Sequence, residues 1–520
     1  MKRLKPVLML ALLLAGAGAT PNVSHAQSSS PPADVAPLQL SLMDCIREAF
    51  KNNKEIRIDS YRPALTENDI LFAKAQFDAS LTASAFYQDQ ESPVLTGPTT
   101  ARGVPSNFKQ GDVLYSDPLL STGGRWQADL RLSKSEASFF PFGPTSPNVA
   151  TSTTDRTTLT LGFSQPLLRN FGRKVSETTI VLSSINRDLD EETFRQRVQL
   201  TLLGVQDAYW TLVYTHQNLD VQQEALRLAQ ALLKLNQIKV QVGTLPPIDI
   251  TQAEAGVASK EEAVITAQAA IENAQDVLRR VIGLDPTSPS WKSPIAPTED
   301  LASSPREVDL DKSLATAIQN RPDLAAGRLR IRSADTTLAF DKNQLKYSLQ
   351  FDGSYALVGL AAPPGGFGDT TKFITGTDFP TYTAQLTLGI PIGNRGAEAT
   401  YSKQRLLREQ EGVSYQSLEQ LAIVEVGLAV RRVQTDLKRI DAAGKNRILQ
   451  EKKVEAEQKK FENGMSTSFQ VLTFQNDLAD ARSREIQAKT SYRISVANLD
   501  NVTGVIDKVL NVSVKDYTRN

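Results

Sequence analysis

The 520-residue sequence contains one structural unit twice, and this repeat limits the folds that the chain can adopt. Residues 40–87 align without a gap on residues 308–355, at an offset of 268 positions. Residues 205–283 align likewise on residues 426–504, at an offset of 221 positions. The offset falls by 47, so the connection between the two aligned segments is 47 residues longer in copy one than in copy two. The segment between the copies contains five prolines, a composition typical of a linker. We therefore expect a mobile N-terminal tail at 27–39, the first repeat at 40–284, a linker at 285–307, the second repeat at 308–505 and a C-terminal tail at 506–520.

Each copy is predicted to contain a very long helix. In copy one, residues 175–242 contain no proline, and at 1.5 Å per residue such a helix extends roughly 100 Å. Apolar residues recur every seven positions on two neighbouring stripes: Val205, Leu212, Leu219, Leu226, Leu233 and Val240 on the first, and Val221, Leu228, Leu235 and Val242 on the second. This strict spacing favours left-handed supercoiling. Two stripes predict neighbours on both sides, as in a ring of helices, although a wide apolar face on a bundle helix would produce the same pattern.

A second helix follows a glycine-containing turn in each copy. In copy one this returning helix has an apolar residue every seven positions from Ile250 to Leu278. In copy two Arg447 interrupts the corresponding series on the outgoing helix, and Glu485 interrupts it on the returning helix. These two charged residues either face water or form one polar layer, and the sequence leaves both interpretations open.

Alternating apolar and polar residues predict half-buried β-strands between the first helices and the long helices. Five segments have this pattern: residues 81–87, 125–133, 158–164, 349–355 and 381–390. A barrel wall between lipid and water would produce the alternation, and so would an amphipathic sheet of a soluble protein. The intervening segments are rich in Gly, Pro, Ser and Thr, which is typical of loops, here outside a membrane. They are residues 91–121, 141–154 and 361–380.

The first 26 residues have the layout of a secretory signal peptide. A basic start at residues 2–5 precedes an apolar stretch of roughly 14 residues, shorter than the ~20 that span a membrane. Ser24-His25-Ala26 then supplies small residues before a cleavage site. An exported chain that lacks long apolar helices would enter a membrane only as a β-barrel. Export therefore favours the outer-membrane interpretation of the strands.

The composition argues against chemistry at reactive side chains. Without the signal peptide the chain retains one cysteine, Cys45, and one histidine, His216, which lie far apart in the sequence. This excludes an internal disulfide and a Cys/His zinc site, and it argues against Cys–His or Ser–His–Asp catalysis. Loss of three of the 58 cations against 58 acidic residues leaves no basic field for nucleic acid. We expect no enzyme, no cofactor, no bound metal and no nucleic-acid partner.

Three features together resemble the TolC-type outer-membrane efflux proteins, also called outer membrane factors. The first is the segment Leu40-Ser-Leu-Met-Asp-Cys-Ile-Arg-Glu-Ala-Phe-Lys-Asn-Asn-Lys-Glu-Ile56, which has a partner at residues 308–324. The second is the strand-to-helix passage Ser164-Gln-Pro-Leu-Leu-Arg-Asn-Phe-Gly172, echoed by Gly389-Ile-Pro-Ile-Gly-Asn-Arg-Gly396. The third is the pair of turns at positions 243 and 464. The likeness covers about residues 40–505, and the order and duplication of these motifs make it specific.

The resemblance implies a mainly α fold with β structure, in which long antiparallel coiled-coil helices form a periplasmic α-barrel and a trimer shares one membrane β-barrel. Each protomer of the homotrimer would contribute four strands to a twelve-stranded barrel, since four strands cannot close a barrel alone. One of the five candidate strands is then in excess, and we expect strand 125–133 to extend a hairpin above the membrane. The channel would lie in the bacterial outer membrane with a large periplasmic part, and contact a periplasmic adaptor and an inner-membrane pump.

The resemblance also locates the periplasmic tip and the narrowest part of the channel. Thr244 and Ser466 are short polar residues suited to capping the next helix. Positions that carry aperture carboxylates in the best-known members are Gln470 and Thr473 here, and a locking arginine is replaced by Ser466. In the implied homotrimer, Asp249 would instead supply one ring of three negative charges. The expected tip and adaptor contacts are Gly243, Thr244, Leu245, Gly464, Met465 and Ser466; the aperture residues are Asp249, Gln470 and Thr473; the strand-to-helix turns are Pro166, Gly172, Pro391 and Gly396.

These features predict a passive outer-membrane channel of a tripartite efflux system, driven by the partner pump. A type I protein-secretion channel would have the same sequence features. A structural coiled-coil or adaptor protein of the cell envelope is the alternative from a different class. The alternating strands in both copies argue against that alternative, because the small β domains of an adaptor would not recur beside helices of ~100 Å.

Overall fold

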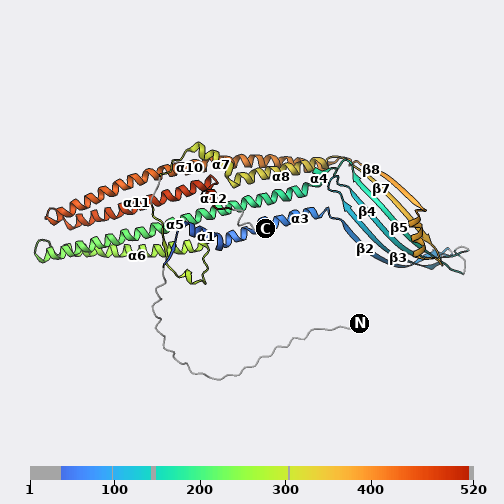
Figure 1. Cartoon of the computed structure of the whole chain (residues 1–520), viewed down its shortest axis with the longest axis horizontal. Helices are drawn as coiled ribbons and strands as arrows, with labels where there is room; N and C mark the ends of the chain where they lie inside the picture. Colours follow the sequence, from blue (N-terminus) through green and yellow to red (C-terminus); the bar gives the residue numbers. More distant parts are fainter. Residues whose placement is uncertain (1–36, 97, 142–143, 145–147, 302–304, 514–520) are drawn as a thin grey trace, which may run out of the picture.

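The computed structural model describes residues 37–96, 98–141, 144, 148–301 and 305–513, and the predicted signal peptide lies outside these residues. The molecule is elongated, with helices along most of its length and one curved sheet at the other end (Figure 1). The two copies lie side by side in the same direction, so that their long helices reverse at the same end. The sheet and the helix turns therefore occupy opposite ends of the molecule.

The two copies share the order of short helices, strands, long helix and returning helix, with β3 and β4 added in copy one and α9 in copy two. Copy one contains β1 (Leu38–Leu40), α1 (Leu42–Asn52), α2 (Lys54–Asp59), α3 (Tyr61–Ala75), β2 (Ser80–Leu95), β3 (Ala101–Pro118), β4 (Arg125–Phe139), β5 (Ala150–Pro166), α4 (Arg173–Ser176), α5 (Thr178–Gln241) and α6 (Ile248–Ile282). The connection contains η1 (Pro289–Trp291) and β6 (Ile295–Pro297). Copy two contains α7 (Leu310–Asn320), α8 (Pro322–Gln344), β7 (Ser348–Ala361), α9 (Phe367–Gly376), β8 (Pro380–Gly389), α10 (Arg395–Glu462), α11 (Ser468–Val502) and α12 (Ile506–Val509).

The seven-residue spacing predicted the long helices correctly. The segment predicted at 175–242 corresponds to α5, which has 64 residues and follows the one-turn helix α4. Helix α5 packs against both α6 and α11, so it has neighbours on more than one side. Ala225, Ala229 and Leu232, which lie between the stripes, are buried. Among the described helices, none combines the length and the apolar character needed to cross a membrane.

The two charged residues that interrupt the spacing in copy two form a polar layer between α10 and α11. The guanidinium of Arg447 contacts the carboxylate of Glu485 across the helix pair, and its Nη1 lies 2.8 Å from Glu451. Glu451 is also 3.0 Å from Arg482, and Glu485 is 3.0 Å from Lys489. All five charges therefore have a partner of opposite sign, and the polar-layer interpretation is correct.

Six antiparallel strands form one sheet among the described residues, in the order β2-β3-β4-β5-β7-β8. All five predicted strands are present, but the loop prediction for 91–121 was wrong because most of this segment forms the end of β2 and all of β3. The loop predicted at 361–380 contains helix α9. The sheet contains six strands, two more than the four that each protomer was expected to contribute to a barrel, because β3 and β4 add a hairpin.

Strand β4 lies in the middle of the sheet and not above it. It pairs with β3 from Arg125 to Ala137 and with β5 from Arg125 to Phe139. The strand predicted to extend a hairpin above the membrane is thus a central strand of the sheet. A central strand needs a partner on each side to satisfy its backbone hydrogen bonds, and the unrecognised strand β3 supplies one of them.

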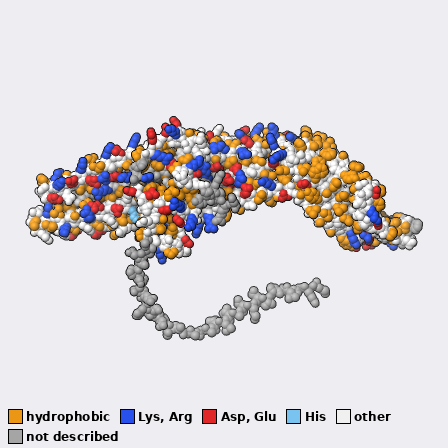
Figure 2. Space-filling model, viewed as in Figure 1, with side chains coloured by type: hydrophobic (Ala, Val, Ile, Leu, Met, Phe, Trp, Pro, Cys, Tyr) orange, Lys and Arg blue, Asp and Glu red, His pale blue; other side chains and the backbone are white. Residues whose placement is uncertain are grey.

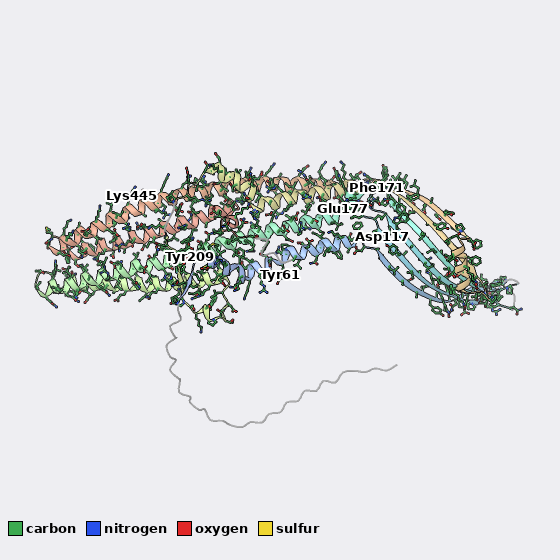
Figure 3. All side chains as sticks on the ribbon, viewed as in Figure 1. Tyr61, Asp117, Phe171, Glu177, Tyr209 and Lys445 are labelled. Atoms are coloured by element: carbon green, nitrogen blue, oxygen red, sulfur yellow. The ribbon has the colours of Figure 1, made fainter. Side chains whose placement is uncertain are left out.

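The segments predicted as tail and linker contact each other and the helices. Strand β1 pairs in parallel with β6, with Leu38 opposite Ile295 and Leu40 opposite Pro297. The Tyr209 hydroxyl of α5 donates to the carbonyl of Leu40 at 3.3 Å and accepts from the N–H of Glu299 at 3.2 Å. A buried tyrosine thus ties the two strands to α5, and Figure 3 shows Tyr209 within the helical part of the molecule.

The largest hydrophobic core lies where α1 packs against α5 and α6. Phe194, Leu212 and Leu278 are fully buried there, as is the single cysteine, Cys45. Burial raises the pKa of the Cys45 thiol to about 12. Because the thiolate is the reactive form, this thiol is protected from modification both by its surroundings and by its protonation.

We expect Cys45 to react with iodoacetamide at pH 8 only when the helical region unfolds. The rise in pKa from 9.0 to about 12 alone lowers the thiolate fraction about a thousandfold. Mass spectrometry of samples quenched over time in increasing denaturant should show that alkylation follows the loss of helical circular dichroism. Rapid alkylation of the native protein would show that the α1 core is not packed as described.

Candidate functional site

The two faces of the sheet differ in polarity. On one face, two consecutive rows of neighbouring residues are apolar: Leu81, Tyr115, Ala128, Leu161, Tyr355 and Tyr382, then Ala83, Val113, Leu130, Leu159, Leu357 and Pro380. On the other face, the adjacent row is Ser80, Ser116, Gln127, Gly162, Ser354 and Thr383. Figure 2 shows hydrophobic side chains gathered over the sheet. A sheet with these two faces suits a wall between lipid and water.

The height of the apolar face matches a bilayer. On β7 the residues of this face extend from Leu349 to Leu357, a span of nine residues, and transmembrane strands need about 9–11. Beyond Leu357, helix α9 lies across the same face. The hydroxyls of Thr157 and Thr370 are 2.6 Å apart, and a Cβ at Gly359 would clash with the carbonyl oxygen of Thr370. Helix α9 thus marks the outer end of the apolar band.

The passages from the sheet to the long helices differ between the copies. In copy one Pro166 ends β5, and Gly172 has a φ of 98° immediately before α4. In copy two Pro391 follows the end of β8, but Gly396 lies inside the first turn of α10. Gly393 instead has the positive φ, 86°. The turn glycine of copy two is therefore Gly393 and not Gly396.

Both long helices end at the tip in the same way. Gly243 and Gly464 each have a φ of 77°. The N–H of Gly243 donates to the carbonyl of Val240 at 3.0 Å, and that of Thr244 donates to the carbonyl of Lys239 at 2.8 Å; the corresponding bonds in copy two are 3.1 and 2.8 Å. This pair of hydrogen bonds ends a helix through one left-handed residue, usually glycine. The predicted turns are thus present at both positions.

The polar residues after these glycines do not cap the next helix. The Thr244 hydroxyl donates to the carbonyl of Lys239 at 2.9 Å, and the Ser466 hydroxyl donates to the carboxylate of Glu457. That bond is the main reason why the pKa of Glu457 is lowered. Helix α11 is capped by the side chain of Thr467. The capping prediction was wrong because both side chains turn back towards the helix that they follow.

A buried asparagine brings two of the predicted aperture residues close together in the fold. Asn236 is fully buried, and its Nδ2 donates to the carbonyl of Asp249 at 3.0 Å and to the hydroxyl of Ser468 at 2.6 Å. The half-buried Asp249 and the exposed Gln470 thus lie in the first turns of adjacent returning helices. The hydroxyl of Thr473, one turn farther along, donates to the carbonyl of Phe469 at 2.9 Å within its own helix.

The tips of the two hairpins are joined by an apolar cluster and by one lysine. Leu245 packs against a small core of Leu232, Phe461 and Val471. The Nζ of Lys239 donates to the carbonyl of Phe461 at 2.5 Å and lies 4.2 Å from the centre of its ring. A cation over an aromatic face adds a further attraction. Asn236 and Lys239 were not predicted, and together they connect α5 with the hairpin of copy two.

A sheet with one apolar face, continuous with antiparallel coiled-coil hairpins, defines a subunit of an outer-membrane channel. The sequence profile of the outer membrane efflux protein family matches residues 46–284 and 314–505. The chain therefore belongs to the outer membrane efflux protein family. This membership places the sheet in the outer membrane and the long helices in the periplasm.

Individual relatives agree with this assignment. The chain is 25% identical over 320 residues to the pyoverdine export outer membrane protein OpmQ of Pseudomonas putida, covering 59% of this chain and 62% of that protein. It is 23% identical over 366 residues to the outer membrane efflux protein BepC of Brucella suis, covering 67% of this chain and 73% of that protein. The match thus spans less than two thirds of OpmQ. The fold is similar to that of the outer-membrane channel OprN, with a TM-score of 0.64, 13% identity and 89% coverage of both chains.

Proposed function

We propose that three copies of this chain form a passive channel for efflux across the outer membrane. The observation that carries the proposal is that, among the described residues, β2 and β8 form the two edges of a sheet with one apolar face, and each has a strand partner on one side alone. In lipid every backbone N–H and C=O needs a partner, so these edges must be covered. Strand β8 of one protomer would run antiparallel to β2 of the next protomer, and three such contacts close a head-to-tail ring.

The tip formed by the two helix turns would contact a periplasmic adaptor, with an inner-membrane pump as the source of energy. Four large apolar residues are exposed around this tip: Val242, Ile248, Met465 and Phe469, each more than 60% exposed. Exposed apolar patches on soluble surfaces commonly mark sites of protein contact. The chain itself would contribute a passage and no catalytic chemistry. Residues 1–26 would be removed on export, and the two repeats at 40–284 and 308–505 would form the working channel subunit.

Small molecules are the cargo class that we favour. The name of one relative assigns it to pyoverdine export, and that of the other assigns it to efflux. The pump would choose the cargo, because the polar face of the sheet carries a mixture of Ser, Thr and Gln side chains with charges of both signs, which favours no particular ligand class. Protein secretion stays the alternative use of the same channel.

The assembly is tested by the mass of the purified particle. Native mass spectrometry of the full chain, extracted from outer membranes in detergent, should give a particle of three copies whose N-terminus is Gln27. A monomer that needs no detergent would reject the channel, because a single copy leaves both sheet edges open.

Asp249 is expected to set the ion preference of the channel. Three copies would place three Asp249 carboxylates around the aperture. In water the electrostatic energy between one charge and an ion about 4 Å away is about 1 kcal/mol. Asp249→Asn should therefore lower the cation-to-anion permeability ratio several-fold. Reversal potentials in salt gradients across planar bilayers measure this ratio.

A matched control is Glu262→Gln on the same helix. Glu262 is exposed and lies about 20 Å farther from the tip. This exceeds the Debye length of about 8 Å at physiological salt, so its loss should leave the ratio unchanged. If Asp249→Asn also leaves the ratio unchanged, Asp249 does not line the constriction.

A further inference from the structure

We propose that the hairpin β3–β4 forms part of the membrane wall, so that the trimer builds an eighteen-stranded barrel. The resemblance to TolC-type proteins implied twelve strands, four from each protomer. Here each protomer supplies six strands in one sheet. The inference rests on the proposed trimer, and it predicts how wide the barrel of that trimer is. The partner of each free edge is a second copy of this chain.

The internal repeat identifies β3 and β4 as the inserted elements. In copy two β7 leads through α9 to β8, and these strands pair directly, with Leu349 opposite Leu388. In copy one the counterparts of β7 and β8 are β2 and β5, which are separated by β3 and β4. Leu81 of β2 pairs with Tyr115 of β3, which pairs with Ala128 of β4. Leu81 and Ala128 thus lie in the same row, two strands apart. They are separated by 47 residues in the sequence, which equals the excess length of copy one.

The hairpin continues both faces of the sheet without interruption. On the apolar face β3 contributes Val113 and Tyr115, and β4 contributes Ala128 and Leu130. These residues lie in the same rows as Leu159 and Leu161 of the neighbouring strand. On the polar face the hairpin contributes Ser116 and Gln127, and in the next rows Asp112, Asp129 and Arg131. A hairpin that stood in water above the membrane would not need an apolar face aligned with the lipid-facing rows.

The turn of the hairpin is attached to the periplasmic side of the sheet. The carbonyl of Thr122 accepts hydrogen bonds from the Gln165 side chain and from the N–H of Gly172, both at 3.1 Å. A Cβ at Gly123 would lie 2.6 Å from the carbonyl of Asn170, so the turn is in close contact with the passage from β5 to α4. In Figure 3, Asp117 of β3 lies at the same end of the sheet as Phe171 and Glu177. The hairpin therefore begins at the helical end and runs the full height of the wall.

The added strands would widen the outlet but not the helical tube. Barrel diameter grows roughly in proportion to strand number, so eighteen strands give a barrel about 1.5 times as wide as twelve. The insertion adds strands only, since each copy keeps one long outgoing helix and one returning helix, α5 and α6 in copy one and α10 and α11 in copy two. The channel would thus open from a helical tube of ordinary width into a broad vestibule at the outer surface.

Electron cryomicroscopy of the purified trimer tests the proposal, because the strands around the barrel can be counted. The matched variant deletes residues 99–146 and joins β2 to β5 through residues 96–98 and 147–148. By analogy with copy two, Leu81 would then face Phe163. We expect eighteen strands in the full chain and twelve in the variant. A trimer of the full chain with twelve strands would overturn the inference and leave the proposed channel intact, whereas the absence of a trimer would reject the proposed function itself.

Polymer access gives a second readout, which does not depend on a map. Neutral polyethylene glycols of increasing size are added to the barrel side of single channels in a planar bilayer, and the largest polymer that still lowers the conductance is recorded. The limiting polymer radius should be about 1.5-fold larger for the full chain than for the deletion variant. Equal limits for the two proteins would place the hairpin outside the wall. If the variant fails to fold, the strand count of the full chain decides the question.

Discussion

Replacing Gly283 with alanine is expected to destabilise the protein by about 2–5 kcal/mol, as the sum of left-handed backbone strain and a steric clash. Gly283 ends α6 with a φ of 71°, and its new Cβ would lie 2.7 Å from the carbonyl carbon and oxygen of Asn52. These neighbours are backbone atoms at the end of α1, so they cannot rotate away. The midpoint of urea unfolding, followed by circular dichroism in detergent, measures the loss.

The internal repeat supplies a duplicate and a control for this prediction. Gly504 has the same φ, and its Cβ would lie 2.7 Å from Asn320 in copy two, so Gly504→Ala should have a similar effect. Gly243→Ala meets no atom within 4 Å at a φ of 77°, so only the strain of about 1–2 kcal/mol remains. Equal losses at Gly283 and Gly243 would show that the contact with Asn52 contributes nothing.

Replacing Leu161 with arginine is expected to abolish assembly in the outer membrane. Leu161 lies on the apolar face of β5, between Ala128 and Tyr355 and one row from the middle of the band. An arginine near the bilayer midplane costs about 2–4 kcal/mol, and a trimer carries three of them. We expect the assembled channel to disappear from outer-membrane fractions on native gels.

The matched control is Thr160→Arg, one residue earlier on the opposite face. Its cross-strand neighbours are Asp129 and Ala356, so the new cation lies beside a carboxylate on the polar face. Assembly should persist, while the ion preference shifts towards anions. If Thr160→Arg prevents assembly and Leu161→Arg does not, the faces of the sheet are assigned the wrong way round.

The sequence allowed the helical part to be predicted well because its signals are local and repeated. Leucines and valines every seven residues located α5 and its partners, and Gly243 and Gly464 located the tip. The buried position of Asn236 was not predicted, because the pattern of the two apolar stripes does not include the row of residues between them. The buried positions Ala225, Ala229 and Leu232 lie between the stripes, and Asn236 continues their spacing. A polar residue in that third row was the available signal.

The sheet was predicted less completely because β3 has no clear alternation. On the side that contributes to the apolar rows, Val113 and Tyr115 are the large apolar residues, and Leu114 between them faces the other way. Gly103, Pro105 and other turn-forming residues of this strand also favour loops in a local reading. The strand is held by pairing with β2 and β4 along its length, and such long-range pairing overrides local preference.

The central claim is that this chain forms a water-filled passage through the outer membrane. Reconstitution of the purified full chain in a planar lipid bilayer tests it most directly, with single-channel current as the readout. The structure predicts uniform stepwise conductance increments from a trimeric particle, and none from Leu161→Arg protein. A wild-type protein that stays monomeric in water and produces no conductance would contradict the channel.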